Sequence, residues 1–274
     1  MFAPGTKIKI IGVPAFREPT GCYVNKIEFD DGNVVERYQQ LVQETDSSAI
    51  KRPARLASGE PNISGDWAAQ QRLPTEAEVR AIALGPDAPG NAPPGRGRVE
   101  VEMSEAGMAA SAGYVREDNP RFHCKPTNII FDWTFDQHIN RIEQYADKII
   151  IRYGFMDTVR TIHMNQDSHP ENIVPSWDGH SIGKWEGDTL VVDTIGFSEG
   201  ILDPRNGARN SNQLRIVERF TMDPENMTLT REHEGEDPLY LTAKFSGKSE
   251  LLASNLPIDS YNCEDLTEEI VEGF

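Results

Sequence analysis

The stretch that decides the fold runs from Lys148 to Phe197 and reads KIIIRYGFMDTVRTIHMNQDSHPENIVPSWDGHSIGKWEGDTLVVDTIGF. Two pairs of apolar runs, 149–155 with 158–164 and 180–185 with 189–195, are each separated by a short polar turn. β-Branched and aromatic residues dominate the runs, and Gly or Asp occupies the bends, which is typical of β-hairpins. The stretch therefore predicts antiparallel sheet.

The rest of the chain continues this strand–turn–strand pattern. Further strands are expected at 7–13, 24–29, 34–38, 129–135, 138–143, 214–221, 227–234 and 239–244, short helices at 75–84 and 104–114, and loops at 85–98 and 200–212. From Ile129 onward no helix separates successive strands, so an antiparallel meander is expected rather than a parallel sheet. We predict a mainly β protein whose meander closes as a calycin- or lipocalin-like barrel, with a β-sandwich as the alternative.

The only candidate domain boundary is the polar stretch 45–61, which follows a predicted hairpin around Asp30-Asp31-Gly32-Asn33. We therefore divide the chain into an N-terminal β-hairpin segment, 1–60, and a β-barrel domain, 61–274. The first segment either belongs to the same domain or forms an oligomer contact. With 274 residues, the chain is long enough to bury a sizeable core.

The charge balance excludes several classes of partner. The chain has 44 acidic against 27 basic residues, a net charge of -17 and a pI of about 4.8. A phosphate backbone or an anionic membrane surface requires a basic face. We therefore expect no nucleic acid and no membrane as partner, and a small hydrophobic molecule as ligand, uncharged or cationic more readily than acidic. The sequence is compatible with a homo-oligomer as well as with a monomer.

Targeting signals and cysteines bear on the compartment. No run approaches 18 apolar residues and no secretory leader is visible, which predicts the cytoplasm, with the periplasm open if Met1 is not the natural start. Cys22, Cys124 and Cys263 are few, widely spaced and odd in number. This pattern predicts neither a disulfide framework nor a structural zinc site.

Cofactor motifs are absent from the sequence. It contains no GxGxxG, P-loop, GxSxG or HExxH pattern, which argues against nucleotide cofactors, serine hydrolysis and zincin chemistry. A metal site built from His163, Asp167, His169 and His180 would match no standard ligand spacing. We predict a protein with no cofactor and no metal.

Two motifs resemble those of a bacterial family frequent in sphingomonads and acidobacteria. Residues 61–67, PNISGDW, resemble its PDLSGxW motif, and residues 179–194, GHSIGKWEGDTLVVDT, are similar to its GHSIGRWEGDTLVVDT signature. The resemblance covers roughly residues 61–250. It implies a shared fold rather than a particular chemistry, and it suggests plant-derived aromatics or terpenoids as the substrate class.

The predicted catalytic group centres on His163. Strand alternation puts Val159, Thr161 and His163 on one face and Arg160, Ile162 and Met164 on the other. Tyr153 lies on the partner arm, and Asp157 is close in sequence. In a barrel with a ligand cavity, histidine, tyrosine and arginine supply a general base, a proton donor and an oxyanion-stabilising cation. A histidine hydrogen-bonded into the wall is the alternative.

Further candidates flank this group. His169 and His180 bracket a Pro/Trp loop and can return a proton, while Trp177 can stack on an aromatic ligand. The other expected substrate contacts are Phe155, Trp133 and Asp132, and Asp132 with His138 is a second candidate acid–base pair. If Trp185 pairs with Thr189, His180 and Asp193 point to opposite sides, unless the register slips by one residue.

These observations predict a cofactor-independent lyase, dehydratase or isomerase. Its substrate would be a hydrophobic, hydroxylated small molecule such as a lignin-derived aromatic or a terpenoid. His163 would act as the base. A non-catalytic carrier of hydrophobic small molecules is the alternative, and metal-dependent hydrolysis is a third.

Overall fold

The computed structural model describes residues 5–14, 22–30, 32–36, 50–69, 101–134, 138–256 and 258–263. The chain divides into two compact units, one of residues 1–44 with 71–96 and one of residues 45–70 with 97–274. Residues 45–60, which the sequence placed in the first segment, thus belong to the second unit. The expected helix 75–84 and the loop 85–98 lie outside the described residues.

The first unit contains a small antiparallel sheet. Its strands are β1 (Ile8–Pro14), β2 (Cys22–Phe29) and β3 (Val34–Glu36), in the order β1-β2-β3. Gly32, at the bend between β2 and β3, has a φ of +85°, a conformation that glycine adopts without strain. The strands predicted at 7–13 and 24–29 are therefore confirmed, and the one predicted at 34–38 is confirmed over its described residues, 34–36.

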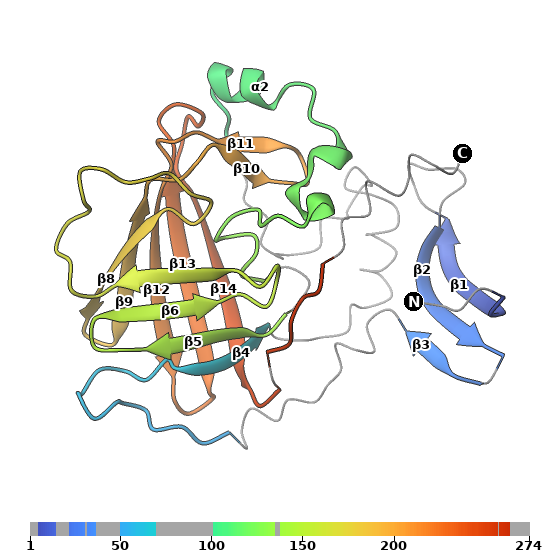
Figure 1. The fold of residues 1–274 in the computed structure, drawn as a ribbon, viewed down its shortest axis with the longest axis horizontal. Helices are drawn as coiled ribbons and strands as arrows, with labels where there is room; N and C mark the ends of the chain where they lie inside the picture. Colours follow the sequence, from blue (N-terminus) through green and yellow to red (C-terminus); the bar gives the residue numbers. More distant parts are fainter. Residues whose placement is uncertain are drawn as a thin grey trace. The chain divides into compact units, whose positions relative to one another are not determined.

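The second unit is built around a closed β-barrel (Figure 1). In its described part nine strands close in the order β12-β13-β14-β4-β5-β6-β7-β8-β9. They are β4 (Gly65–Ala69), β5 (Asn140–Gln144), β6 (Lys148–Arg152), β7 (Val159–His163), β8 (His180–Glu186), β9 (Thr189–Ile195), β12 (Arg215–Asp223), β13 (Thr228–Glu236) and β14 (Phe245–Ser254). The predicted barrel is confirmed, and the sandwich alternative is not what forms.

One pair of barrel strands is parallel. Strands that alternate in direction around a closed ladder must be even in number, so nine described strands require one parallel neighbour pair. That pair is β7–β8, joined over Ile162↔Ser181 and His163↔Ile182. A parallel connection needs a long crossover, and residues 164–179 provide it. The Pro/Trp loop of the sequence is this crossover.

The β8–β9 hairpin is tighter than expected. Glu186 pairs with Thr189, so Gly187 and Asp188 alone form the turn, and Gly187 has a φ of +62°. The register is therefore one residue away from the predicted one, with Ile182 opposite Asp193. Paired residues point to the same side of a sheet, as do residues two apart on a strand. His180 and Asp193 thus share one face, which is the outcome expected from a register slipped by one residue.

Other predicted elements shift for identifiable reasons. Residues 129–134 form turns instead of a strand, because the Asn128 side chain accepts hydrogen bonds from the Ile130 and Phe131 amides. Among the described residues the C-terminal strand is β14, which begins beyond the predicted 239–244. Asp237 orders residues 238–240 as a turn by accepting from the Leu239 and Tyr240 amides. The expected loop 200–212 carries a two-stranded ribbon, β10 (Gly200–Asp203) and β11 (Ala208–Asn210).

The predicted helix at 104–114 forms in part, as α2 (Glu105–Ser111). The Ser104 side chain caps it by accepting a hydrogen bond from the Gly107 amide at 3.0 Å. Figure 1 shows α2 beside the β10–β11 ribbon. Short 3₁₀ turns, η3 (Arg116–Asp118) and η4 (Pro120–His123), follow the helix.

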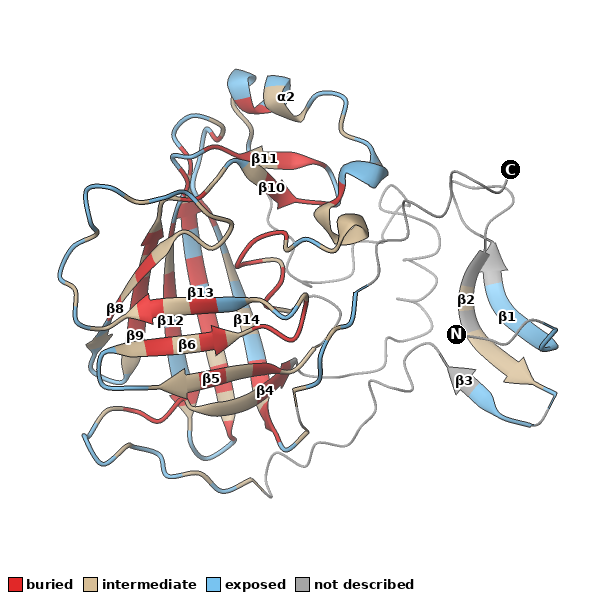
Figure 2. Cartoon of the chain, viewed as in Figure 1, coloured by how far each residue is buried: buried red, intermediate tan, exposed pale blue. Residues whose placement is uncertain are grey.

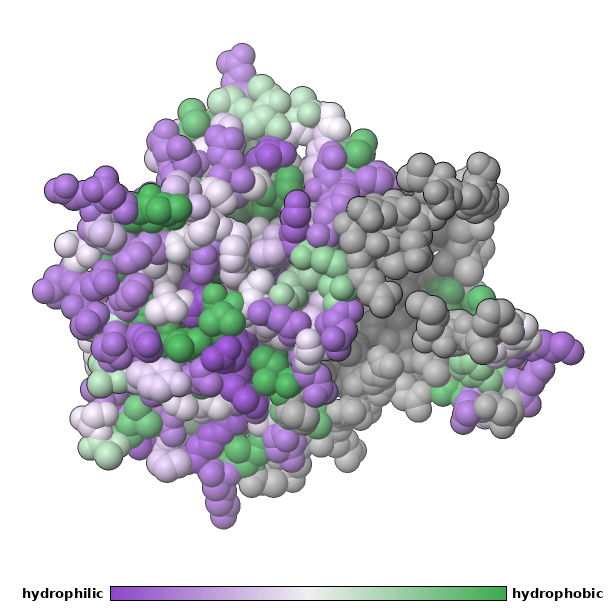
Figure 3. All heavy atoms as spheres, in the orientation of Figure 1, coloured by the Kyte–Doolittle hydropathy of each residue, from purple (hydrophilic) through white to green (hydrophobic). Residues whose placement is uncertain are grey.

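In most barrel strands alternate residues are buried (Figure 2). The apolar core of the barrel includes Trp67, Trp133, Ile142, Ile149, Ile151, Tyr153, Ile162, Leu190, Val192, Phe220, Leu229 and Leu251. The face of the molecule drawn in Figure 3 is largely hydrophilic with small separate apolar patches.

Two contacts far apart in sequence close the second unit. Arg52 donates to the carbonyls of Asp66 at 3.0 Å and Ser254 at 3.2 Å, which lie on the neighbouring strands β4 and β14. Cys124 and Cys263 form a disulfide bond across 139 residues of sequence. The sequence predicted no disulfide framework, because no short cysteine spacing marks this pair.

No helix in the described ranges is both long enough and apolar enough to span a membrane.

Candidate functional site

The predicted site residues separate into two groups, one inside the barrel and one outside. Strand β7 divides them, because Arg160 is buried and points into the barrel, whereas His163 lies on the other face. The alternation predicted for this strand is confirmed. His163 therefore does not join Tyr153 and Arg160, and the predicted constellation of base, acid and cation does not form around it.

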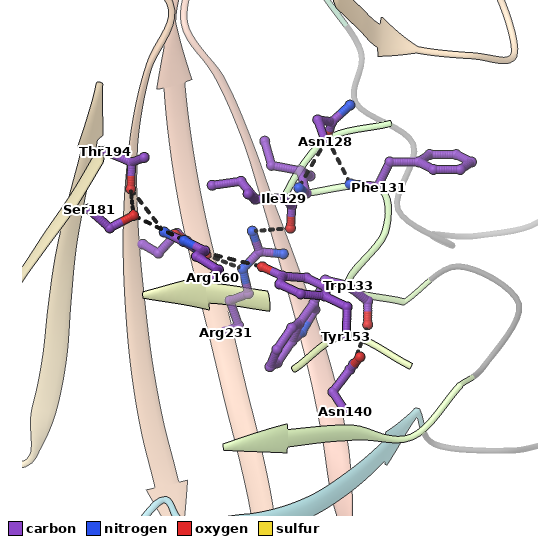
Figure 4. Close-up of polar contacts among 12 residues, drawn as sticks. Asn128, Ile129, Phe131, Trp133, Asn140, Tyr153, Arg160, Ser181, Thr194 and Arg231 are labelled. Atoms are coloured by element: carbon purple, nitrogen blue, oxygen red, sulfur yellow. Dashed lines mark hydrogen bonds and ion pairs between the residues drawn. The ribbon is translucent and has the colours of Figure 1, made fainter. Parts of the chain in front are cut away.

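The interior cluster consists of Tyr153, Arg160, Glu218, Arg231 and His233 (Figure 4 shows Tyr153, Arg160 and Arg231). Glu218 lies between the two arginines: its Oε1 accepts from Arg231 Nε at 2.8 Å, and its Oε2 accepts from Arg160 Nη2. The three charged side chains are only 1–2 % exposed. Two buried guanidiniums thus share a single carboxylate.

Hydroxyl groups accept further hydrogen bonds from the Arg160 guanidinium. Arg160 Nε donates to Ser181 Oγ at 3.0 Å, and Nη2 donates to Thr194 Oγ1 at 2.9 Å. A longer contact of 3.5 Å joins Nη1 to the Tyr153 hydroxyl. Ser181 and Thr194 are cross-strand partners on β8 and β9, so the tight hairpin register places both hydroxyls against Arg160.

The charges of the interior cluster control its protonation. Burial alone would raise the pKa of Glu218, but the guanidiniums of Arg160 and Arg231 outweigh burial and lower that pKa to about 2. Burial would lower the pKa of Arg160, and Glu218 reverses this effect. Burial raises the pKa of Tyr153, opposed by Arg160. At neutral pH the cluster therefore holds two arginine cations, one carboxylate and a protonated phenol.

A turn between α2 and β5 inserts Trp133 into the barrel beside Arg231. The Arg231 Cζ lies 5.5 Å from the centre of the Trp133 ring, and Arg231 Nη2 donates to the Ile129 carbonyl at 3.2 Å. Trp133 also meets Tyr153 and Phe220 edge-on, at ring-centre distances of 5.9 and 5.7 Å. Its indole Nε1 is buried without a hydrogen-bond partner. Figure 4 shows Trp133, Tyr153 and Arg231 close together.

His233 is the interior histidine that sequence reasoning missed. It pairs with Glu218 across β13 and β12 and shares a face with Arg231, two residues away. The side chain lies against β14, because a Cβ at Gly247 would be 2.5 Å from the imidazole. His233 is 8 % exposed, and neither ring nitrogen has a hydrogen-bond partner. The sequence did contain a signal for His233, because the alternation of side chains along Thr228–Glu236 places Arg231 and His233 on the same face.

The protonation of His233 follows from its surroundings. Burial, reinforced by the nearby Arg231 charge and opposed by Glu218, lowers its pKa to about 4. The imidazole is therefore neutral near pH 7. A neutral imidazole offers one N–H donor and one nitrogen acceptor.

The outer histidine cluster consists of His163, His169, His180 and Asp193. The rings of His163 and His180 stack with centres 4.9 Å apart and planes 13° apart. His169 Nδ1 is 2.8 Å from His180 Nδ1, and His169 Nε2 is 3.7 Å from an Asp193 carboxylate oxygen. Arg215 donates to both Asp193 oxygens at 2.8 Å. The three histidines predicted as functional are thus brought together, but on the outer face.

The outer histidine cluster is hydrogen-bonded in part, and His169 Nε2 is buried without a hydrogen-bond partner. Burial lowers the pKa of His169, opposed by Asp193, and burial together with the neighbouring histidines lowers the pKa of His180. One imidazole therefore donates to the other, and Asp193 is held by Arg215. Within the described residues no group of three or more His, Cys, Asp or Glu side chains is arranged to hold a metal ion.

Asp157 and Phe155, two further predicted residues, hold the C-terminal segment 258–263. Asp157 is exposed and accepts from the Ser260 hydroxyl at 2.9 Å and from the Tyr261 amide at 3.0 Å. Phe155 meets Tyr261 at a ring-centre distance of 5.0 Å. The contacts of Asp157 are therefore those of a surface anchor, and they do not place it with the catalytic group in which the sequence included it.

Trp177 and Asp132 lie against the core. Trp177 meets the edge of Tyr153 at a ring-centre distance of 5.9 Å. Asp132 Oδ2 accepts from the Thr127 amide at 2.8 Å, while its buried Oδ1 has no partner. Burial raises the pKa of Asp132 to about 7, opposed by the hydrogen bonds from Thr127 and Asn128. Asp132 and Trp133 are successive residues of one turn, and they face different partners.

No family model matches the chain, and no curated protein matches it. The resemblance to the bacterial family stays a prediction, and the candidate site is identified from its geometry.

Proposed function

We propose that the barrel binds a hydrophobic, hydroxylated small molecule at the interior cluster and converts it by acid–base catalysis without a cofactor. The reaction class is that of a lyase, dehydratase or isomerase. The observation that supports this most is His233, a buried imidazole with two unpartnered nitrogens beside Arg231.

An unsatisfied imidazole is unfavourable for folding. Each buried polar group without a partner costs about 1–3 kcal/mol, so most native structures satisfy such groups. Departures from this rule concentrate at functional sites, where a ligand supplies the missing partners. Trp133 adds a second unpartnered donor in the same barrel. We interpret both as contacts for a bound molecule.

The interior cluster can divide the steps of a dehydration among its members. His233, neutral near pH 7, would take the proton from the substrate carbon. The released electron pair forms the double bond, and the departing hydroxyl leaves as water after Tyr153 protonates it. Arg160 would stabilise the phenolate that remains on Tyr153, and the proton held by His233 then restores the phenol. His233 replaces His163 as the proposed base.

The aromatic side chains around the cluster suit an apolar ligand. Trp133, Phe220 and Tyr153 meet edge-to-face inside the barrel, and Trp177 extends this group to the crossover. Sites for small molecules combine such apolar walls with a few fixed polar groups. This combination supports a hydroxylated aromatic or terpenoid as the substrate class.

A carrier is the second candidate function. Arg160 is already held by Glu218, Ser181 and Thr194, so the polar groups are fixed before any ligand arrives. Fixed groups suit binding as well as catalysis, and a carrier needs no proton transfer.

The disulfide bond bears on the compartment. Disulfide bonds persist mainly in oxidising surroundings. The Cys124–Cys263 bond therefore favours the periplasm or the cell exterior over the cytoplasm that the sequence predicted.

The function can be tested with two matched histidine variants. The purified protein is incubated with a panel of hydroxylated aromatics and terpenoids, and products are followed by mass spectrometry. Loss of a general base reduces turnover by about 10²–10⁴-fold. We expect such a loss in His233→Gln and less than a twofold change in His163→Gln, with circular dichroism as the folding control.

Two results would contradict the proposed chemistry. Binding without conversion across the panel would leave the carrier function. A loss of turnover in His163→Gln with full turnover in His233→Gln would move the reaction to the outer histidine cluster.

A further inference from the structure

The interior cluster carries a net positive charge. Arg160 and Arg231 are cations, Glu218 is the shared anion, and the phenol of Tyr153 and the imidazole of His233 are neutral near pH 7. One positive charge is thus left over in a region where the charged side chains are 1–2 % exposed. An uncompensated buried charge is strongly unfavourable.

The other buried carboxylates of the described chain do not compensate this charge. Asp203 forms an ion pair with Arg205, and Asp237 accepts from the Ser211 amide and hydroxyl. Asp132 accepts from Thr127, and the pKa of its carboxyl responds to burial and to hydrogen bonds with no contribution from an arginine. Each of the three is therefore engaged elsewhere.

Partial charges compensate Arg231 only in part. The Ile129 carbonyl accepts one of its N–H groups, and the face of Trp133 lies 5.5 Å away. A carbonyl dipole and an aromatic quadrupole stabilise a cation, and each does so less than a carboxylate does. Of the two arginines, Arg231 also has the fewer side-chain acceptors, since Arg160 has Ser181 and Thr194 in addition to Glu218.

Two unpartnered hydrogen-bonding side chains flank Arg231. Trp133 Nε1 is an N–H donor, and His233 presents an N–H in either neutral tautomer. Arg231 lies over the ring of the first and two residues from the second on the same face of β13. A cation with unused N–H donors near it is suited to binding an oxyanion.

We infer that the ligand of the barrel is an amphipathic organic anion, whose carboxylate or phenolate binds beside Arg231. Its apolar body would pack on the aromatic side chains of the interior. This inference rests on the proposed function and specifies its substrate class. It reverses the expectation drawn from the overall charge of -17, because the surface is acidic while the interior is cationic.

Three probes of one shape test the inference: cinnamate, cinnamamide and cinnamyl alcohol, of which only the first is an anion. Binding is measured by calorimetry and by the shift in unfolding temperature at pH 7.5. We expect cinnamate to bind at least tenfold more tightly than either neutral probe. Arg231→Met should lose at least tenfold in cinnamate affinity and leave cinnamamide affinity within twofold.

The matched control is Arg219→Met, on the outer face of β12. Arg219 is 49 % exposed and pairs with Glu186, so its removal lowers the total positive charge by the same amount. We expect cinnamate affinity within twofold of the wild type in this variant. If Arg231→Met fails to fold, the ratio of cinnamate to cinnamamide affinity in the wild-type protein still decides the question.

The outcomes separate the two proposals. Equal affinity for cinnamate and the neutral probes would contradict the inference that the ligand is an anion, while the barrel would remain a binding site. Cinnamate binding that depends on Arg219 instead of Arg231 would overturn the interior position. If none of the three probes binds at millimolar concentration, both the anion and the interior binding site are contradicted.

Discussion

The interior cluster and the outer histidine cluster differ in what their polar groups lack. Inside the barrel, Glu218 and two arginines are buried, a positive charge is left over, and His233 has no hydrogen-bond partner. Outside, the imidazoles of His169 and His180 contact each other, and Arg215 neutralises Asp193. The outer histidine cluster also contains one unpartnered buried nitrogen, His169 Nε2, but its carboxylate has an arginine partner. The uncompensated charge beside the unpartnered His233, which the outer histidine cluster does not have, therefore identifies the candidate site.

The first way to break this comparison is to remove the carboxylate that the two interior arginines share. Glu218→Gln leaves two buried guanidiniums without an anion and is expected to lower the free energy of unfolding by about 3–5 kcal/mol. Urea unfolding of the variant and the wild type measures the difference. A loss below about 1 kcal/mol would mean that water reaches the arginines.

Asp132 gives the next largest effect, through the pH dependence of stability. Its pKa is raised from 3.8 to about 7 in the fold, so the folded state favours the neutral acid. Stability from this group is full below pH 3.8, falls as the pH rises to about 7, and is then constant, an effect of about 4 kcal/mol. Asp132→Asn should remove this decline between pH 4 and pH 7, which denaturant unfolding at several pH values will show. An unchanged slope would contradict the burial of this carboxyl.

His233 predicts a dependence of opposite sign. Its pKa is lowered from 6.5 to about 4, so the folded state favours the neutral base. Stability is full above pH 6.5 and is lost as the pH falls to about 4, by about 3 kcal/mol. His233→Gln should flatten the stability profile over this interval, and His163→Gln is the matched control. The same flattening in both variants would remove the distinction between inside and outside.

The smallest effect is expected from the outer carboxylate. Asp193 pairs with Arg215, which is 48 % exposed, and exposed ion pairs contribute at most about 1 kcal/mol. Asp193→Asn should therefore change the free energy of unfolding far less than Glu218→Gln does in the same urea experiment. A comparable loss would show that the outer histidine cluster is a structural centre of the barrel.

The barrel could be predicted from the sequence because its information is local. Alternation of apolar residues with short Gly or Asp turns marks most of the strands, and it also placed Arg160 and His163 on opposite faces. The parallel pair β7–β8 could not be predicted in this way, since it depends on how many strands close the ring. The Cys124–Cys263 bond could not be predicted from local pattern either, because 139 residues separate the two cysteines.

The candidate site was predicted only in part, for physical reasons. Tyr153, Arg160 and Trp133 lie inside as expected, but the cluster needs Glu218, Arg231 and His233 from strands far along the chain. Polar residues alternate along these strands, and the same alternation is found in a strand with one face in water. The sequence pattern therefore did not show that these polar residues are buried. Burial, which only the closed barrel supplies, turns these residues into a site.

The most direct measurement is nuclear magnetic resonance of the imidazole ring nitrogens in protein labelled with ¹⁵N-histidine, before and after addition of cinnamate. The chain has six histidines, and His233→Gln and His163→Gln assign the two signals that matter. Ligand binding inside the barrel should shift the His233 nitrogens and leave those of His163 unchanged. Shifts at His163 with an unmoved His233 signal would contradict an interior site.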